Sequence, residues 1–121
     1  MKYVLDTSAI IDLIQSLKDK SVDLFKECIT ADLALYEIGN FLWKIKRIDL
    51  LPDFINILKF IKIEHAGLSE EALSIAVDEG LSYYDAIYLF LSKKYKVPLV
   101  SSDKELIKKG AVDTGKLKLK G

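Results

Sequence analysis

The chain is poor in the residues that build covalent cross-links and nitrogen- or sulfur-ligated metal sites. It has one cysteine, Cys28, and one histidine, His65, among 121 residues. A single cysteine excludes an internal disulfide framework and is typical of a reducing compartment. A single histidine excludes a histidine-rich metal centre. Any bound metal would therefore have oxygen ligands, which favours a hard cation such as Mg²⁺ or Mn²⁺.

Long apolar runs are also missing. No stretch approaches the roughly 18 apolar residues that a transmembrane helix needs, and no signal-peptide pattern is present. We therefore expect a cytoplasmic protein without membrane contact. Half of the residues are hydrophobic, which indicates a packed core, and the length fits one domain over residues 1–121.

The charges balance overall but are unevenly distributed. Residues 1–92 carry 9 basic and 15 acidic side chains, a net charge of −6, whereas residues 93–121 carry 9 basic and 3 acidic side chains, a net charge of +6. This asymmetry predicts an acidic centre beside a basic surface that suits a nucleic-acid backbone. An ordinary solvated, lysine-rich end of the chain fits the same composition.

Short apolar runs alternate with helical patterns along the chain. The run Tyr3–Leu5 is typical of a buried strand. Asp6 follows the run, and a helical pattern begins soon after Asp6. The pattern predicts further strands at 33–34, 62–64, 98–100 and within 111–121, and helices over 21–29, 35–48, 50–61, 69–79 and 81–95. Ser69 is expected to start the helix over 69–79, and Gly80 to end it. This alternation predicts a three-layer α/β/α domain with a mainly parallel central sheet.

Two aspartates follow predicted strands. Asp6 comes after the strand at 3–5, and Asp103 comes after the strand at 98–100. Because parallel strands end at one edge of a sheet, we expect both carboxylates at the edge where α/β folds bind ligands. A simpler role stays open for Asp6, since either Asp6 or Ser8 could cap the following helix.

Capping boxes offer a structural explanation for some of these polar residues. Asp85 lies in the first turn of the most apolar helix, where an uncompensated carboxylate would cost several kcal/mol. Either a site compensates it, or it belongs to a capping box, because Ser82-x-x-Asp85 has the required spacing. Ser102-x-x-Glu105 has the same spacing. Asp103 is then one position beyond the predicted cap and stays available for a site.

Further polar residues could support such a site. Glu37, Asn40 and Lys44 share one face of a predicted helix, which is either an inward-facing stripe with Asn40 orienting Glu37 or an ordinary exposed face. Ser8 and Ser101 could orient a water or a phosphate, although roles in caps and turns fit them equally well.

The four carboxylates would repel one another if Asp6, Glu37, Asp85 and Asp103 converged. Two carboxylates about 4 Å apart repel by about 4 kcal/mol at an effective dielectric of about 20. Protonation or a divalent cation would relieve that repulsion. Such a cluster suits one or two Mg²⁺ or Mn²⁺ ions and a phosphodiester substrate, which these ions activate toward attack by water.

Four short segments carry these carboxylates in a specific order. They are Leu5-Asp6-Thr7-Ser8, Tyr36-Glu37-Ile38-Gly39-Asn40, Leu81-Ser82-Tyr83-Tyr84-Asp85-Ala86-Ile87-Tyr88 and Leu99-Val100-Ser101-Ser102-Asp103. Together they resemble the PIN-domain nucleases, and most closely the VapC-type toxins of prokaryotic toxin–antitoxin pairs. The family often has threonine where this chain has Ser101, a change that keeps the hydroxyl.

The resemblance covers the whole chain and carries functional implications. It implies a Mg²⁺- or Mn²⁺-dependent endoribonuclease that cleaves single-stranded or structured RNA by water attack. It also implies that Asp6, Glu37, Asp85 and Asp103 are the catalytic and metal-binding residues. A homodimer and a cognate antitoxin that covers the site are further implications of the family.

Two other interpretations remain open from the sequence. A receiver-type phosphoacceptor domain has a similar fold and length, but it needs paired acidic residues after its first strand, where this chain has Asp6 alone. A catalytically silent PIN-like binding module would keep the fold without the chemistry, although the presence of all four acids argues against it. Phosphorylation by a small phosphodonor would identify the first alternative, and metal binding without RNA cleavage would identify the second.

Overall fold

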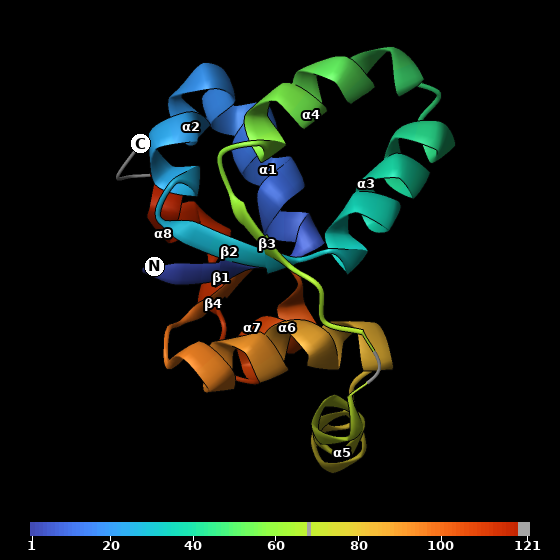
Figure 1. Cartoon of the computed structure of the whole chain (residues 1–121), viewed down its shortest axis with the longest axis vertical. Helices are drawn as coiled ribbons and strands as arrows, with labels where there is room; N and C mark the ends of the chain where they lie inside the picture. The colour runs from blue at the N-terminus through green and yellow to red at the C-terminus, as the bar shows by residue number, and fades with distance from the viewer. Residues whose placement is uncertain (68, 119–121) are drawn as a thin grey trace.

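A five-stranded parallel sheet forms the centre of the computed structural model, which describes residues 1–67 and 69–118 (Figure 1). The strand order is β3-β2-β1-β4-β5, and every neighbouring pair is parallel. The strands are β1 (Tyr3–Leu5), β2 (Cys28–Ala31), β3 (Lys62–Glu64), β4 (Leu99–Ser101) and β5 (Val112–Asp113). The predicted α/β fold with a parallel central sheet is confirmed.

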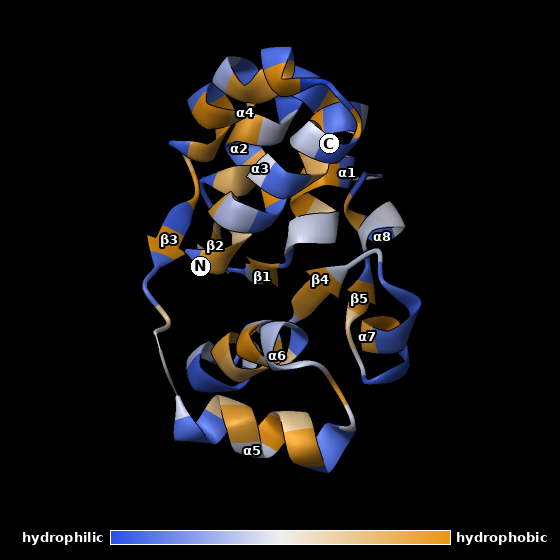
Figure 2. Cartoon of the chain, turned by 90° about the vertical axis from the view of Figure 1, so that its right-hand side faces the viewer, coloured by the Kyte–Doolittle hydropathy of each residue, from blue (hydrophilic) through white to orange (hydrophobic). Residues whose placement is uncertain are grey.

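Helices cover both faces of the sheet. One face carries α1 (Thr7–Leu17), α2 (Ser21–Phe25), α3 (Leu33–Lys44) and α4 (Leu51–Leu58), and the other carries α6 (Tyr83–Tyr95) and α7 (Lys104–Lys108). Figure 2 shows α5 (Glu70–Glu79) on the outer side of α6. The short α8 (Thr114–Lys118) packs against α1. Among the described residues, none of these helices is long and apolar enough to cross a lipid bilayer.

The central strands are buried because helices shield them on both faces. Val4 and Leu5 of β1 and all residues of β2 are buried. Parallel sheets covered on both sides need such continuous apolar runs. Helix α6 lies between the sheet and α5 and buries Tyr88 and Leu91.

Capping residues set the limits of α5 as the sequence predicts. The Ser69 hydroxyl accepts a hydrogen bond from Ala72 N at 3.2 Å, which starts the helix. Gly80 ends it with a φ of 67°, a left-handed conformation that glycine adopts without steric cost.

The predicted helix over 21–29 and strand at 33–34 are wrong. Helix α2 ends at Phe25, and 28–31 is strand β2, while Leu33 starts α3. The β-branched Ile29 and Thr30 lie in the middle of the sheet, where β2 pairs with both β1 and β3. The Asp32 side chain accepts a hydrogen bond from Leu33 N and so helps α3 begin directly after the strand.

The predicted strands within 111–121 are only partly observed. Strand β5 covers Val112–Asp113, but 114–118 is helix α8, and 119–121 lie outside the described residues. The alternation of lysine and leucine over this stretch is too short to distinguish a strand from a helix. Packing decides: Thr114 and Leu117 are buried one turn apart, and Lys118 Nζ lies 2.7 Å from Asp12 Oδ1 on α1.

Candidate active site

Strands β1 and β4 bring Asp6 and Asp103 to the same edge of the sheet. The two strands are parallel neighbours, with Leu5 paired to Val100, and Asp6 N donates a hydrogen bond to the Val100 carbonyl at 3.2 Å. Directly beyond this edge the chain enters α1 after β1 and α7 after β4. The structure therefore has both aspartates at the carboxyl edge, where the sequence predicts them.

Asp6 is a buried carboxylate held by three hydrogen-bond donors. Its Oδ1 accepts hydrogen bonds from Ser8 Oγ at 2.7 Å and from Ala9 N at 2.8 Å. Its Oδ2 accepts from Ser101 Oγ at 2.5 Å. Asp6 thus caps α1 and also lines the edge of the sheet, so the capping role and the site position are not alternatives. Ser8 and Ser101 orient this carboxylate.

Burial dominates the electrostatics of Asp6. Loss of hydration raises its pKa to about 6, although the hydrogen bonds from Ser101, Ala9 and Ser8 favour the charged form. The negative charge of Asp85 raises the pKa further. At neutral pH, Asp6 therefore carries a buried negative charge that has no salt bridge within residues 1–67 and 69–118.

Glu37 is held by two hydroxyl groups that local sequence patterns do not identify. Thr7 Oγ1 donates to Glu37 Oε1 at 2.7 Å, and Tyr88 Oη donates to the same oxygen at 2.8 Å. In the sequence, Thr7 directly follows Asp6, and Tyr88 lies three residues after Asp85 on the same helix. Neither position singles out a contact with Glu37.

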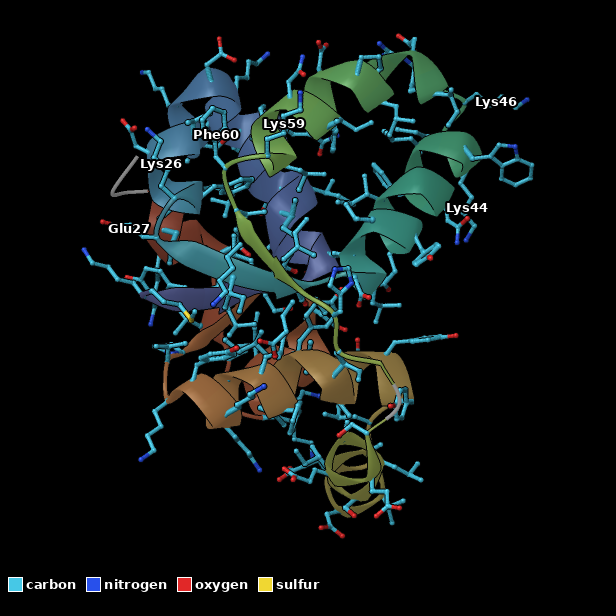
Figure 3. The ribbon with its side chains drawn as sticks, viewed as in Figure 1. Lys26, Glu27, Lys44, Lys46, Lys59 and Phe60 are labelled. Atoms are coloured by element: carbon cyan, nitrogen blue, oxygen red, sulfur yellow. The ribbon has the colours of Figure 1, made fainter. Side chains whose placement is uncertain are left out.

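Asn40 and Lys44 do not form an inward-facing stripe with Glu37. Asn40 is exposed, and no hydrogen bond joins it to Glu37 in the part of the chain that the structure describes. Figure 3 shows Lys44 on the outer side of α3, pointing to solvent. The outward orientation follows from the burial of Ile38 and Leu42, which fixes the opposite face of α3 against the core.

Asp85 lies half-buried in the first turn of α6. Its backbone N–H donates to Ser82 Oγ at 3.1 Å, so Ser82 caps the helix as the capping-box interpretation predicts. Burial raises the pKa of Asp85, and the negative charges of Asp103 and Glu37 raise it further. Asp85 therefore takes part in the helix cap and also lies close to other negative charges.

Asp103 is the N-cap of α7, contrary to the prediction that Ser102 takes this role. Asp103 Oδ1 accepts a hydrogen bond from Glu105 N at 2.9 Å. The Ser102 hydroxyl instead contacts Asp12 and Thr114, at 3.1 and 2.8 Å. These two partners come from α1 and α8, and local spacing within the sequence carries no information about them.

All four predicted carboxylates line one pocket of about 290 Å³. Its lining consists of Asp6, Thr7, Ser8, Ile11, Glu37, Phe41, Asp85, Tyr88 and Asp103. No lysine or arginine is among these lining residues, which all come from the described part of the chain. The pocket is thus rich in oxygen donors and lacks an internal positive charge.

A divalent hard cation fits this set of donors. Within residues 1–67 and 69–118, no group of three histidine, cysteine, aspartate or glutamate side chains is arranged to hold a metal ion. Mg²⁺ does not require such a group, because it typically binds one or two carboxylates and keeps several waters. The raised pKa values of Asp6 and Asp85 show that the pocket already disfavours its own negative charge.

A larger cavity of about 570 Å³ lies elsewhere, between the end of α1 and α4. Its lining mixes Lys18 and Asp19 with apolar side chains such as Phe54 and Ile57. Only two carboxylates, Asp19 and Asp53, are among its lining residues, and Lys18 lines the same cavity. We therefore assign the chemistry to the smaller acidic pocket in spite of its size.

The sequence is similar to known nucleases. A family model described as the PIN domain matches residues 3–112. Exonuclease VapC9 of Pyrobaculum aerophilum is 31% identical over 121 residues, which cover 93% of this chain and 90% of that protein. Ribonuclease VapC3 of the same organism is 31% identical over 124 residues, which cover 90% of this chain and 95% of that protein.

Solved structures share the fold. The crystal structure of PAE2754 from Pyrobaculum aerophilum aligns with a TM-score of 0.88 and 30% identity over 99% of this chain and 96% of that chain. A toxin–antitoxin complex from Klebsiella pneumoniae aligns with a TM-score of 0.64 and 16% identity over 84% of this chain and 87% of that chain. The second likeness concerns the fold alone.

Proposed function

The chain belongs to the PIN-domain family, and from this premise we propose that it is a metal-dependent endoribonuclease of the VapC type. The observation that carries the proposal is the convergence of four carboxylates on one pocket whose described lining has no positive side chain. The similarity to Ribonuclease VapC3 supports RNA as the substrate. No feature favours a phosphoacceptor domain, because Glu37 and Asp85 lie on helices.

Asp6, Glu37, Asp85 and Asp103 would hold one or two Mg²⁺ or Mn²⁺ ions, each ion bound by one or two of these carboxylates and by waters. When bound, such a cation lowers the pKa of a coordinated water and neutralises charge on the phosphodiester. Asp6 is pre-oriented for this by Ser8 and Ser101, which engage both of its oxygens.

The chain supplies no histidine for proton transfer at this pocket. Its single histidine, His65, is exposed and lies 3.1 Å from Asp32, outside the pocket lining. A mechanism in which the RNA 2′-hydroxyl attacks needs a general base and a general acid, roles that histidine fills most often. We infer that water attacks instead, which leaves 5′-phosphate and 3′-hydroxyl ends.

An antitoxin partner and a homodimer belong to the same proposal. The Klebsiella pneumoniae neighbour is described as a toxin–antitoxin complex, which supports a protein partner. Large apolar side chains on α3 and α5 are also exposed, including Trp43 and Val77 at 73% and 74%. Such surfaces are typical of association sites. Light scattering that shows a monomer at micromolar concentration would contradict the dimer.

Cleavage of a circular single-stranded RNA tests the central proposal. An exonuclease, which is the activity in the name of VapC9, needs a free RNA end, and a circular RNA has none. We expect Mg²⁺ or Mn²⁺ to support linearisation and EDTA to stop it. Asp85→Asn should abolish cleavage, whereas Asp78→Asn, which changes an exposed carboxylate on α5, should retain it. Cleavage in EDTA, or 2′,3′-cyclic phosphate ends, would contradict the mechanism. Degradation of linear RNA alone would indicate an exonuclease.

A further inference from the structure

Three side chains from three helices meet at one oxygen of Glu37. Thr7 Oγ1 and Tyr88 Oη lie 2.7 and 2.8 Å from Glu37 Oε1, and the two hydroxyl oxygens lie 2.8 Å from each other. Thr7 begins α1, Glu37 lies on α3 and Tyr88 lies on α6. Because α6 is on the opposite face of the sheet from α1 and α3 (Figure 1), the contact joins the two helical layers.

Two hydroxyl protons serve the three oxygen–oxygen contacts of this triangle. Both hydroxyls donate to Oε1, and the contact between the two hydroxyl oxygens closes the triangle. Tyr88 is 1% exposed, so water does not compete for its hydroxyl. Within the described residues no hydrogen bond reaches Oε2 of Glu37. One oxygen of the carboxylate is therefore engaged, and the other is left to the pocket.

A second hydrogen bond from a tyrosine of α6 to a glutamate, Glu64 on β3, provides an internal comparison. The Tyr95 hydroxyl donates to Glu64 Oε1, and Lys94 Nζ lies 3.2 Å from Glu64 Oε2. The charge of Glu64 is thus balanced within the protein. Glu37 receives the same kind of hydrogen bond, but among residues 1–67 and 69–118 it has no salt bridge.

We propose that Thr7 and Tyr88 are positioning residues, which engage Oε1 of Glu37 so that Oε2 is presented to a divalent cation. The inference rests on the proposed function, because it names how this chain prepares one of the four carboxylates. Because folding already fixes the Glu37 side chain, cation binding causes a smaller loss of side-chain conformational entropy. Groups that orient a metal ligand in this way typically change metal affinity by about 10- to 100-fold when mutated.

Calorimetric titration of the metal-free full chain with Mn²⁺ tests the proposal. Tyr88→Phe and Thr7→Val each remove one hydroxyl, and each should weaken Mn²⁺ binding about 10-fold. Thr7→Ser keeps the hydroxyl and should bind like the wild type. Tyr95→Phe removes the matching hydroxyl outside the pocket and should also leave Mn²⁺ affinity unchanged. Melting temperatures without metal are recorded for every variant.

The outcomes separate positioning from a merely structural role. If Thr7→Val and Tyr88→Phe lower the melting temperature but bind Mn²⁺ like the wild type, the hydroxyls only satisfy buried polar groups and the proposal is overturned. Should Tyr88→Phe fail to fold, the Thr7→Val and Thr7→Ser pair decides by the same criterion. Absence of Mn²⁺ binding by the wild type would instead refute the proposed function, a result distinct from a loss confined to the variants.

Discussion

Ser101 Oγ lies 2.5 Å from Oδ2 of Asp6 and so joins two residues that are 95 positions apart in the chain. The serine is fully buried, and its hydroxyl also accepts a hydrogen bond from Asp103 N at 2.9 Å. One side chain thus orients one candidate metal ligand and fixes the backbone of another. Its removal would disturb both aspartates at the sheet edge.

We expect Ser101→Ala to destabilise the protein by about 1–3 kcal/mol at pH 8, because a buried carboxylate loses a donor. The hydrogen bond favours the charged form of Asp6, so its loss should raise the Asp6 pKa above its value of about 6. The destabilisation should therefore shrink as the pH falls from the raised pKa of the variant toward 6, and it should be at its smallest at pH 5. Urea unfolding of both proteins at pH 5 and pH 8 measures this, and an equal loss at both pH values would contradict it.

Asp6→Asn should change how stability depends on pH in EDTA. The pKa of Asp6 is about 6 in the fold against 3.8 for a free side chain, so between these values the folded state binds more protons than the unfolded state. The free energy of unfolding of the wild type should therefore fall as pH rises from about 4 to about 6, by an amount on the order of 3 kcal/mol. Asparagine removes this dependence and still caps a helix.

At neutral pH in EDTA we expect Asp6→Asn to be as stable as the wild type or more stable by about 1 kcal/mol. The comparison uses urea midpoints at half-unit pH steps from 4 to 8. Parallel curves for the two proteins would show that Asp6 does not carry the unfavourable buried charge.

Asp85→Asn distinguishes a carboxylate among like charges from a helix cap. Burial, Asp103 and Glu37 all raise the pKa of Asp85, so removing its charge should stabilise the metal-free protein. Because the group is half-exposed, we expect only about 0.5–1 kcal/mol, or roughly 2–4 °C in melting temperature. A purely capping role predicts a loss of about 1 kcal/mol.

Ser82→Ala is the matched control for the cap. It removes the hydroxyl that accepts from Asp85 N and should cost about 1 kcal/mol with or without metal. If Asp85→Asn lowers the melting temperature as Ser82→Ala does, in EDTA and in Mn²⁺ alike, the carboxylate acts as a cap only.

Mn²⁺ or Mg²⁺ should stabilise the wild type by mass action. At a free concentration of about 100 times the dissociation constant, binding contributes about 2.7 kcal/mol. For a domain of this size each kcal/mol raises the melting temperature by roughly 4 °C. Asp6→Asn and Asp85→Asn should show smaller shifts, and exposed Asp78→Asn the full shift. Equal shifts for all four proteins would place the cation away from the pocket.

Local pattern was sufficient for the parts of this protein whose cause is local. The apolar run Tyr3–Leu5 followed by Asp6 predicted a strand that ends at a polar turn, because both signals lie within a few residues. Ser69 and Gly80 likewise predicted both ends of α5. The order of these elements predicted the parallel α/β fold and the sheet edge at which Asp6 and Asp103 lie.

Tertiary contacts determined the local structure at positions where the sequence fits two alternatives. Cys28–Ala31 continues an amphipathic pattern but becomes a strand because β1 and β3 pair with it on both sides. Ser102 and Asp103 are both good capping residues, and Asp103 takes the cap while Ser102 contacts Asp12 and Thr114. In each case the deciding partner is remote in the sequence.

The partners of the candidate ligands follow the same rule. Tyr88 contacts a glutamate 51 positions away, and Ser101 an aspartate 95 positions away. Asp6, Asp85 and Asp103 could be selected from the sequence because each lies at the end of a strand or the start of a helix. Glu37 lies inside α3, and only the family resemblance distinguished it from an ordinary helix residue. Which hydroxyl orients which carboxylate could not be read from the sequence, because side-chain periodicity records only the face on which a residue lies, whereas the packing of both helical layers on the sheet determines what that face meets.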